Sequence, residues 1–267
     1  VNRCRIRLIL LVVYLLVCIH TVAFSQIGSW QTHVSYLSGQ SVAVVGTKIY
    51  AATRNGFFYY DKNTGETTTL SKADGLSDVG ISRILYFADQ KKLLIAYQNG
   101  NLDFLAVTET GEPSGITNVN TVVSASNLPD SRGINHLNRI GNNVYLSTNF
   151  GIVVLDIIKN EIRDTYISKR LNGSPQAIFQ TTVTADSLYA LTDSLQRSDL
   201  VNQLQAIRFA PTVNIADPAN WHLVTKPGSL TGTAIESIVT NQGRFTAPGN
   251  GKGGYEQKSG PRSGTQP

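Results

Sequence analysis

The stretch KIYAATRNGFFYYD, residues Lys48 to Asp61, decides the fold that we predict for this chain. It predicts two short strands, Ile49 to Thr53 and Phe57 to Asp61, in which polarity alternates from residue to residue. Between them stands Asn55-Gly56, a dipeptide that readily adopts the positive φ angles of tight hairpin turns. The stretch therefore predicts a β-hairpin.

The same pattern occurs twice more along the chain. KLLIAYQNGNLDFL (Lys92 to Leu105) places Gly100 where the first stretch has Gly56, and NVYLSTNFGIVVLD (Asn143 to Asp156) places Gly151 there. A unit of about 40 to 50 residues that contains four short strands is typical of a β-propeller blade. The repeat therefore predicts an all-β fold built from such blades.

We predict an incomplete β-propeller over residues 26–250, with about four blades of four antiparallel strands and part of a fifth. Equivalent positions of the second strand in successive blades are expected for Tyr50, Leu94, Tyr145 and Tyr189. A fifth blade is expected to open at Ile235 to Val239. Residues 251–267 lack alternation and have almost no apolar residues, so we predict a disordered or frameshifted tail and a truncated propeller.

The first 25 residues predict a secretory signal peptide. Three arginines, at positions 3, 5 and 7, precede an apolar run from Leu8 to Ile19, and Ser25 fits a cleavage site. An uncleaved membrane anchor is the alternative, but the run is short for a membrane span, which needs about 20 residues. Export through the inner membrane to the periplasm is therefore expected.

Removing this leader changes the chemistry expected of the chain. Its three arginines lower the formal net charge from +5 to +2, because none of the 18 acidic residues lies in it. Both cysteines, Cys4 and Cys18, are also lost, so no disulfide is predicted. The mature chain has no basic surplus that would favour nucleic acid and no apolar stretch long enough for a transmembrane segment.

No catalytic constellation is found in the mature chain. Its three histidines, His33, His136 and His222, lie in different repeats without metal-ligand spacing, and no nucleophile elbow, P-loop or dinucleotide fingerprint is present. Trp30 and His33 are expected to pack where the propeller closes. We therefore predict no catalytic, cofactor-binding or metal-binding residue and no cofactor, and we assign no ligand-binding residue.

Aspartates near the turns are interpreted as structural. The spacing Asp61-x-Asn63-x-Gly65 resembles the start of a calcium loop but lacks its later glutamate, so a hairpin turn is predicted. Asp61, Asp103 and Asp156 are expected at matching positions of the repeat, where they would hold turns or pack blades. Carboxylate pairs for a glycosidase would have to come from separate blades.

Another segment carries a resemblance to known proteins. LSKADGLSDVGIS, with Asp74-Gly75-Leu76-Ser77 at its centre, links the first blade to the second. The order of DGLS, strand, turn, strand, NG and strand resembles the two-component-regulator propeller repeat. Together with IGSWQTHVSYLSGQSVAVVGTKIYAATRNGFFYYDK and FGIVVLDIIKNEIRDTYI, it resembles the N-terminal propeller of the PorZ family of type IX secretion proteins of Bacteroidota.

That resemblance implies a non-enzymatic accessory protein at the cell surface. It also implies that the protein works, as the PorZ family does, in an attachment complex with the sortase PorU and with PorV and PorQ. In that complex the protein would deliver anionic lipopolysaccharide to the sortase. Surface location would require a C-terminal sorting domain. The alternatives are a periplasmic glycan-sensing ectodomain of a hybrid two-component regulator and a propeller glycosidase or lyase.

Overall fold

The structure of the 267-residue chain is a computed structural model. It describes residue 7 and residues 36–169, 173–184, 186–193, 203–210, 212–215, 217–224, 235, 237–241, 244–249 and 252–258. The described residues from 36 onward belong to one compact unit, residues 34–267. The predicted signal peptide lies outside the described residues except for Arg7, and so do Trp30 and His33.

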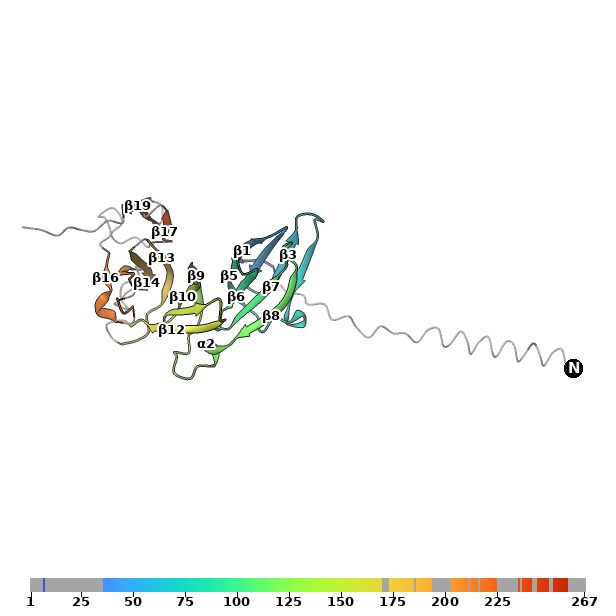
Figure 1. Ribbon diagram of the computed structural model, residues 1–267, viewed down its shortest axis with the longest axis horizontal. Coiled ribbons are helices and arrows are strands. Elements are labelled where there is room, and N and C mark those ends of the chain that lie inside the picture. Colours follow the sequence, from blue (N-terminus) through green and yellow to red (C-terminus); the bar gives the residue numbers. More distant parts are fainter. Residues whose placement is uncertain are drawn as a thin grey trace, which may run out of the picture. The chain divides into compact units, whose positions relative to one another are not determined.

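Separate antiparallel sheets follow one another along the chain, and we call them blades 1 to 5 (Figure 1). Blade 1 contains β1 (Gly39–Val45), β2 (Lys48–Thr53), β3 (Phe57–Asp61) and β4 (Thr67–Leu70). Blade 2 contains β5 (Ile81–Phe87), β6 (Lys92–Tyr97), β7 (Leu102–Val107) and β8 (Pro113–Val119), and the short helix α2 (Thr121–Ser124) follows it. Blade 3 contains β9 (Ile134–Ile140), β10 (Asn143–Thr148), β11 (Gly151–Asp156) and β12 (Glu161–Ile167).

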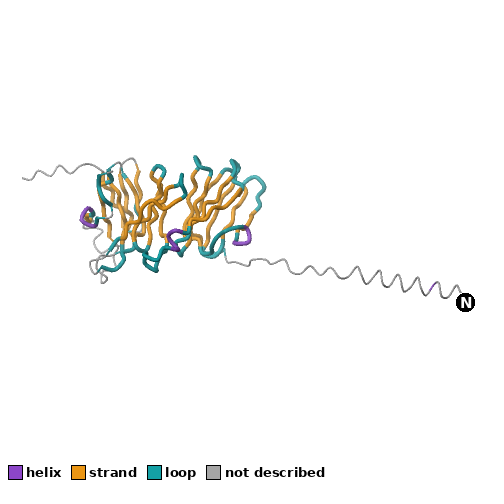
Figure 2. Tube along the Cα trace, turned by 60° about the horizontal axis from the view of Figure 1, so that its bottom comes forward, coloured by secondary structure: helices purple, strands orange, loops and turns teal. Residues whose placement is uncertain are grey.

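Blade 4 contains β13 (Ile178–Val183), β14 (Ser187–Thr192), β15 (Gln203–Arg208) and β16 (His222–Leu223), and blade 5 contains β17 (Val239–Asn241), β18 (Arg244–Gly249) and β19 (Lys252–Lys258). In every sheet, strands that are consecutive in the sequence are hydrogen-bonded neighbours. Loops and turns gather at the two ends of the strands (Figure 2). The prediction of four complete blades and part of a fifth is confirmed for the described residues.

The end of the chain differs from the prediction. Lys252–Lys258 forms β19, which pairs with β18 from Gly249 opposite Lys252 to Arg244 opposite Lys258. The prediction of a structureless tail from residue 251 is therefore wrong for this strand. Backbone amides and carbonyls of a neighbouring strand suffice for pairing, so the segment forms a strand without the apolar alternation on which the prediction relied.

The predicted equivalence of Tyr50, Leu94, Tyr145 and Tyr189 is confirmed. Each is the third residue of the second strand of its blade, in β2, β6, β10 and β14. Each also packs in the cluster that its blade shares with the next one. Tyr50 additionally donates its hydroxyl to the backbone oxygen of Gly111 in blade 2, at 2.8 Å.

The turns between the second and third strands do not share one conformation. Gly100 and Gly151 have positive φ, +91° and +146°, whereas Gly56 does not. In blade 1 the Thr53 amide donates to the Gly56 oxygen at 2.8 Å, and the Thr53 hydroxyl accepts from the Gly56 amide at 2.9 Å. The Asn55-Gly56 hairpin is thus confirmed, but its expected positive φ is wrong because the Thr53 side chain closes a longer turn.

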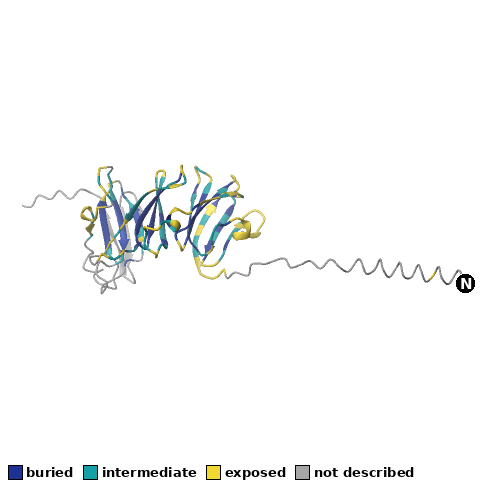
Figure 3. Cartoon of the chain, turned by 90° about the horizontal axis from the view of Figure 1, so that it is seen from below, coloured by how far each residue is buried: buried dark blue, intermediate teal, exposed yellow. Residues whose placement is uncertain are grey.

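The hydrophobic core lies between successive blades. In β6, Leu93, Ile95 and Tyr97 pack toward blade 1, while Leu94 and Ala96 pack toward blade 3. Figure 3 shows the resulting pattern, with buried residues along the strands and exposed ones at the turns. A sheet that is buried on both faces gains most of its stability from the sheets beside it.

The DGLS linker of the resemblance has a clear structural role. Lys72–Asp74 forms a short 3₁₀ helix that Ser71 caps, and Gly75 follows at φ +102°. Leu76 then enters the core between blades 1 and 2. The next amide, of Ser77, donates to Asp103 at 2.8 Å, so the linker is fixed to blade 2.

The prediction for the repeated aspartates was partly wrong. Asp61 and Asp156 both end a third strand, opposite the first residue of the second strand, and accept amides of the following turn. Asp103 instead lies opposite Ile95, near the start of β7, fully buried. It accepts the Tyr97 hydroxyl at 2.6 Å and the Ser77 amide. Asp103 follows the repeat glycine Gly100 by three residues, whereas Asp61 and Asp156 follow theirs by five, so the three positions do not match.

A buried lysine joins blades 1 and 2. Lys48, only 2% exposed, places its ammonium 2.7 Å from Asp61 and 2.6 Å from Glu112 of blade 2. The hydrogen bond from Lys48 lowers the pKa of Asp61. Asp61 also accepts the Asn63 amide at 2.8 Å, so the carboxylate holds the turn and the blade contact together.

We predict that Gly151→Ala destabilises the protein by about 2 to 4 kcal/mol. A Cβ at this position would lie 1.9 Å from the Tyr166 oxygen, and the backbone φ of +146° suits only glycine. The matched control is Gly115→Ala, whose Cβ would meet nothing within 4 Å and should change stability by less than about 0.5 kcal/mol. Urea unfolding measures both, and equal stability of the two variants would contradict the turn geometry.

Candidate functional site

The histidines do not form a common site. His136 lies on β9 and His222 on β16, and the two line different cavities. Among the described residues, no group of three or more His, Cys, Asp or Glu side chains could hold a metal ion. No helix in the described part of the chain is long and apolar enough to cross a membrane.

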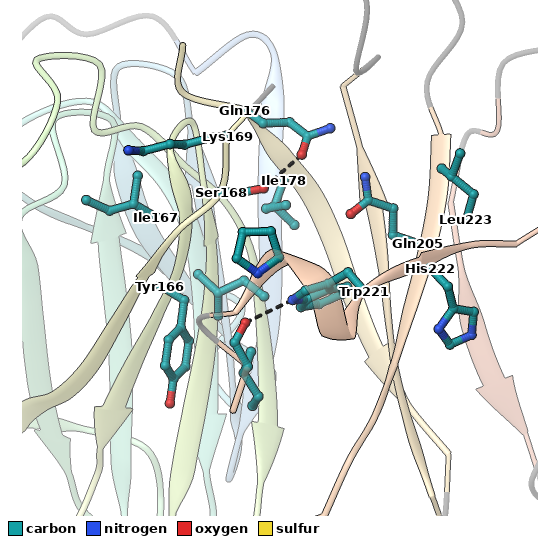
Figure 4. Close-up of a pocket in the computed structure, with 13 residues that line it drawn as sticks. Tyr166, Ile167, Ser168, Lys169, Gln176, Ile178, Gln205, Trp221, His222 and Leu223 are labelled. Atoms are coloured by element: carbon teal, nitrogen blue, oxygen red, sulfur yellow. Dashed lines mark hydrogen bonds between the residues drawn. The ribbon is translucent and has the colours of Figure 1, made fainter. Parts of the chain in front are cut away.

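A groove lies between the outer strand of blade 3 and the loop that leads into β16 of blade 4 (Figure 4). Its cavity volume is about 230 Å³. The residues that line it include the aromatic pair Tyr166 and Trp221, the polar side chains Ser168, Lys169, Gln176, Gln205 and His222, and the apolar side chains Ile152, Ile167, Ile178, Ile215, Pro218 and Leu223. The groove thus combines an apolar floor with several hydrogen-bonding groups.

Trp221 is held in place by the loop that carries it. The 3₁₀ helix η2 (Pro218–Asn220) is capped by Asp217, whose side chain accepts the Ala219 amide at 2.9 Å, and Trp221 follows it directly. The indole N–H donates to the backbone oxygen of Ile215 at 2.9 Å. The polar edge of the ring is therefore satisfied inside the loop, and the ring itself lines the groove (Figure 4).

The polar side of the groove is also fixed by hydrogen bonds. The buried Gln176 accepts the Ser168 hydroxyl at 2.8 Å and donates to the Asp193 backbone oxygen at 2.8 Å. Tyr166 lies on the same side of the groove as Ser168 (Figure 4), and burial raises the pKa of its phenol. An apolar wall with aromatic rings and a few fixed polar groups suits a small neutral or weakly polar ligand, such as a sugar.

Sequence reasoning missed this groove. Neither Tyr166 nor Trp221 was singled out from the sequence. They come together because the fold packs β12 beside the loop before β16. The one available signal was the Pro218-Ala219-Asn220-Trp221 segment, where an aromatic residue follows a helical turn outside the strand pattern.

His136 lies in the second cavity, and its ring is only partly exposed. Burial, with a smaller contribution from the positive charge of Arg83, lowers the pKa of His136 to about 4 from the ordinary value near 6.5. Its Nδ1 atom is buried and has no hydrogen-bond partner. The imidazole is therefore neutral at neutral pH.

We predict that this histidine makes stability fall as the pH drops from about 6.5 to about 4. In that window the unfolded chain binds a proton at position 136 and the folded chain does not, so acid favours unfolding. The free energy of unfolding falls by about 3 kcal/mol across this window because of His136. The fall is complete below pH 4, where the imidazole is protonated in both the folded and the unfolded state.

Unfolding free energies of the wild type, His136→Gln and His222→Gln at pH 7 and pH 4.5 measure this effect. His136→Gln should lose part of the pH dependence, while His222→Gln, a change at an exposed residue, should keep it. An unchanged pH dependence in His136→Gln would contradict the burial of this imidazole.

Sheets of four antiparallel strands that pack face to face in sequence order define the chain as a β-propeller domain. The family model described as the N-terminal β-propeller domain of the type IX secretion protein PorZ matches residues 49–222. The chain belongs to this PorZ N-terminal β-propeller family. No curated protein matches it by sequence.

Solved structures agree with this assignment. PorZ of Porphyromonas gingivalis, described as an essential bacterial surface component of the type IX secretion system, is 27% identical with a TM-score of 0.58, over 84% of this chain and 28% of that one. The extracellular domain of a hybrid two-component system of B. thetaiotaomicron has a TM-score of 0.60 at 16% identity, over 85% of this chain and 28% of that one. The chain thus spans little more than a quarter of either protein, and the second likeness shows the fold alone.

Proposed function

We propose that this chain is the N-terminal propeller of a non-enzymatic accessory protein of the type IX secretion system. In this proposal the protein is exported and acts at the cell surface in an attachment complex with the sortase PorU and with PorV and PorQ. There it helps to deliver anionic lipopolysaccharide to the sortase. The single observation that carries the proposal is the family match across residues 49–222.

The chemistry of the described residues supports a binding role. Two ion pairs join neighbouring blades, Lys48 with Glu112 and Arg139 with Asp89, and hold the sheets together. The groove at Trp221 offers an aromatic ring and the fixed amide group of Gln176, which suit the sugar units of a glycolipid. A rigid propeller presents such surfaces for docking without needing a catalytic centre.

Deletion of the gene in its own bacterium tests the proposal. We predict that type IX cargo proteins then keep their sorting domains and lose their lipopolysaccharide modification, as seen on immunoblots of the cell surface. The full-length gene should restore both. Normal cargo processing in the deletion strain would contradict the secretion role. If the deletion instead abolished the transcriptional response to a glycan, the alternative of a sensor ectodomain would replace it.

Complementation with variants tests the groove separately. Trp221→Leu keeps an apolar side chain but removes the aromatic face, so we expect reduced lipopolysaccharide modification of cargo. The matched control is Tyr60→Leu, which removes an exposed aromatic side chain on β3, far from Trp221 in the sequence. Equal complementation by both variants would exclude the groove from this role and leave the secretion role standing.

A further inference from the structure

The first strands of blades 1 to 4 share an irregularity. The pairing register of β1, β5, β9 and β13 with the following strand shifts near the start of each first strand. The first paired residue after each shift is Ser41, Arg83, His136 or Gln180. These first strands also contact one another in sequence order, β1 with β5, β5 with β9, and β9 with β13. We call this shared place the inner-strand position.

In blades 1 and 4 the inner-strand position joins neighbouring blades. The Ser41 hydroxyl bonds to the backbone oxygen and amide of Ile84 in blade 2, at 3.3 and 3.2 Å. The Gln180 amide group bonds to the backbone oxygen and amide of the buried Ile238, at 2.7 and 3.0 Å. A polar side chain at this position therefore has a structural role when it makes this pair of bonds.

In blades 2 and 3 the same position makes no such pair. Arg83 donates from one terminal nitrogen to the oxygen of the adjacent Ser82, at 2.7 Å, and no carboxylate of the described residues forms an ion pair with it. Burial lowers the pKa of Arg83, so the guanidinium is partly desolvated without a counter-ion. A desolvated cation that lacks an anionic partner is costly.

His136 has a free ring nitrogen beside this cation. Its Nδ1 is buried without a partner, and an enclosed N–H without an acceptor costs more than an enclosed lone pair. The proton of the neutral ring is therefore better placed on Nε2, which is not enclosed. The charge of Arg83 influences the pKa of His136, which places the two groups near each other.

Arg83 and His136 line one cavity of about 350 Å³. Its other lining residues are Asn135, Phe179, Gln180, Leu191 and Ile235, and no acidic side chain is among them. Asn135 and Gln180 are engaged with backbone oxygens. The cavity therefore presents an unpaired guanidinium and an imidazole N–H, both hydrogen-bond donors, in a partly desolvated setting.

We propose that this cavity binds an oxyanion, the phosphate or carboxylate group of a ligand. Arg83 would supply the charge and its free guanidinium N–H groups, in the fork geometry that suits such anions, and His136 would donate from Nε2. The anion would neutralise the cation that the fold leaves without a counter-ion. The proposal rests on the geometry of the inner-strand position, goes beyond the secretion role and does not depend on it.

Isothermal titration calorimetry of the whole chain tests the proposal, with inorganic phosphate, glucose 1-phosphate, glucuronate and neutral glucose as probes. We expect at least one anionic probe to bind and glucose not to bind. Arg83→Gln should weaken binding about tenfold or more, the loss expected for charge-assisted hydrogen bonds. The matched control, Arg54→Gln, removes the same charge at an exposed turn and should change the affinity less than about twofold.

The outcomes separate the sources of the anion and decide the proposal. Tighter binding of glucose 1-phosphate or glucuronate than of phosphate indicates an anionic group carried on a glycan, and equal binding indicates a free anion. The proposal is overturned if no anion binds, or if Arg83→Gln binds as tightly as Arg54→Gln. If Arg83→Gln does not fold, proton NMR of the wild type decides the question. The imidazole resonance of His136 is the one that is missing from the spectrum of His136→Gln, and the anion must shift it. An unshifted resonance overturns the proposal.

Discussion

The fold depends on sheets that are buried on both faces. The second strands of blades 2, 3 and 4 have only their first residue partly exposed, so they have no face that could point to water. A sheet of this kind buries its apolar area only if another sheet lies on each side. Consecutive blades therefore stabilise one another, and the side chains between them, such as Tyr50 and Leu94, are committed to packing.

Because the side chains between blades are used for packing, few of them are available to bind a ligand. Some ionic groups between blades pair with each other, as Lys48 does with Asp61 and Glu112. Binding groups are left at two kinds of place: loops such as the one that carries Trp221, and first strands, where adjacent blades contact each other along their inner strands. The two cavities of interest occur at these places, and each takes residues from more than one blade.

The inner-strand position shows how a repeat separates packing from binding. The backbone irregularity is the same in four blades, but the residue is Ser41, Arg83, His136 or Gln180. Ser41 and Gln180 bond to the backbone of the next blade, whereas Arg83 and His136 do not. The backbone of the repeat does not require a cation or an imidazole at this position. The binding of an anion explains why Arg83 and His136 occupy it.

Much of the fold could be predicted from the sequence because the same strand pattern recurs in successive repeats. The alternation of apolar and polar residues predicted the strands. The alignment of the repeats predicted that Leu94 and Tyr145 occupy equivalent positions. The details that failed depend on side chains or on backbone pairing alone: Thr53 closes its turn without a positive φ at Gly56, Asp103 holds the linker at Ser77, and Lys252–Lys258 pairs without apolar alternation.

The candidate sites were beyond sequence reasoning for a different reason. Arg83 and His136 lie more than 50 residues apart in the sequence. Nothing in their local segments distinguishes them from ordinary strand residues. Their relation follows from the packing of β5 beside β9 and from hydrogen bonds that are made at equivalent positions but missing here. Such a contrast can be seen only once the blades are aligned in space.

The most direct measurement compares the free energies of unfolding of Gln180→Met and Arg83→Met at pH 7.5 in a buffer without phosphate. Both changes replace a long polar side chain by the same apolar one at the inner-strand position. Gln180→Met should cost about 1 to 3 kcal/mol, because the buried amide and carbonyl of Ile238 lose their partners. Arg83→Met should change stability by less than about 0.5 kcal/mol or increase it, because it removes a desolvated charge. An equal loss in both variants would contradict the account, since Arg83 would then be a packing residue like Gln180.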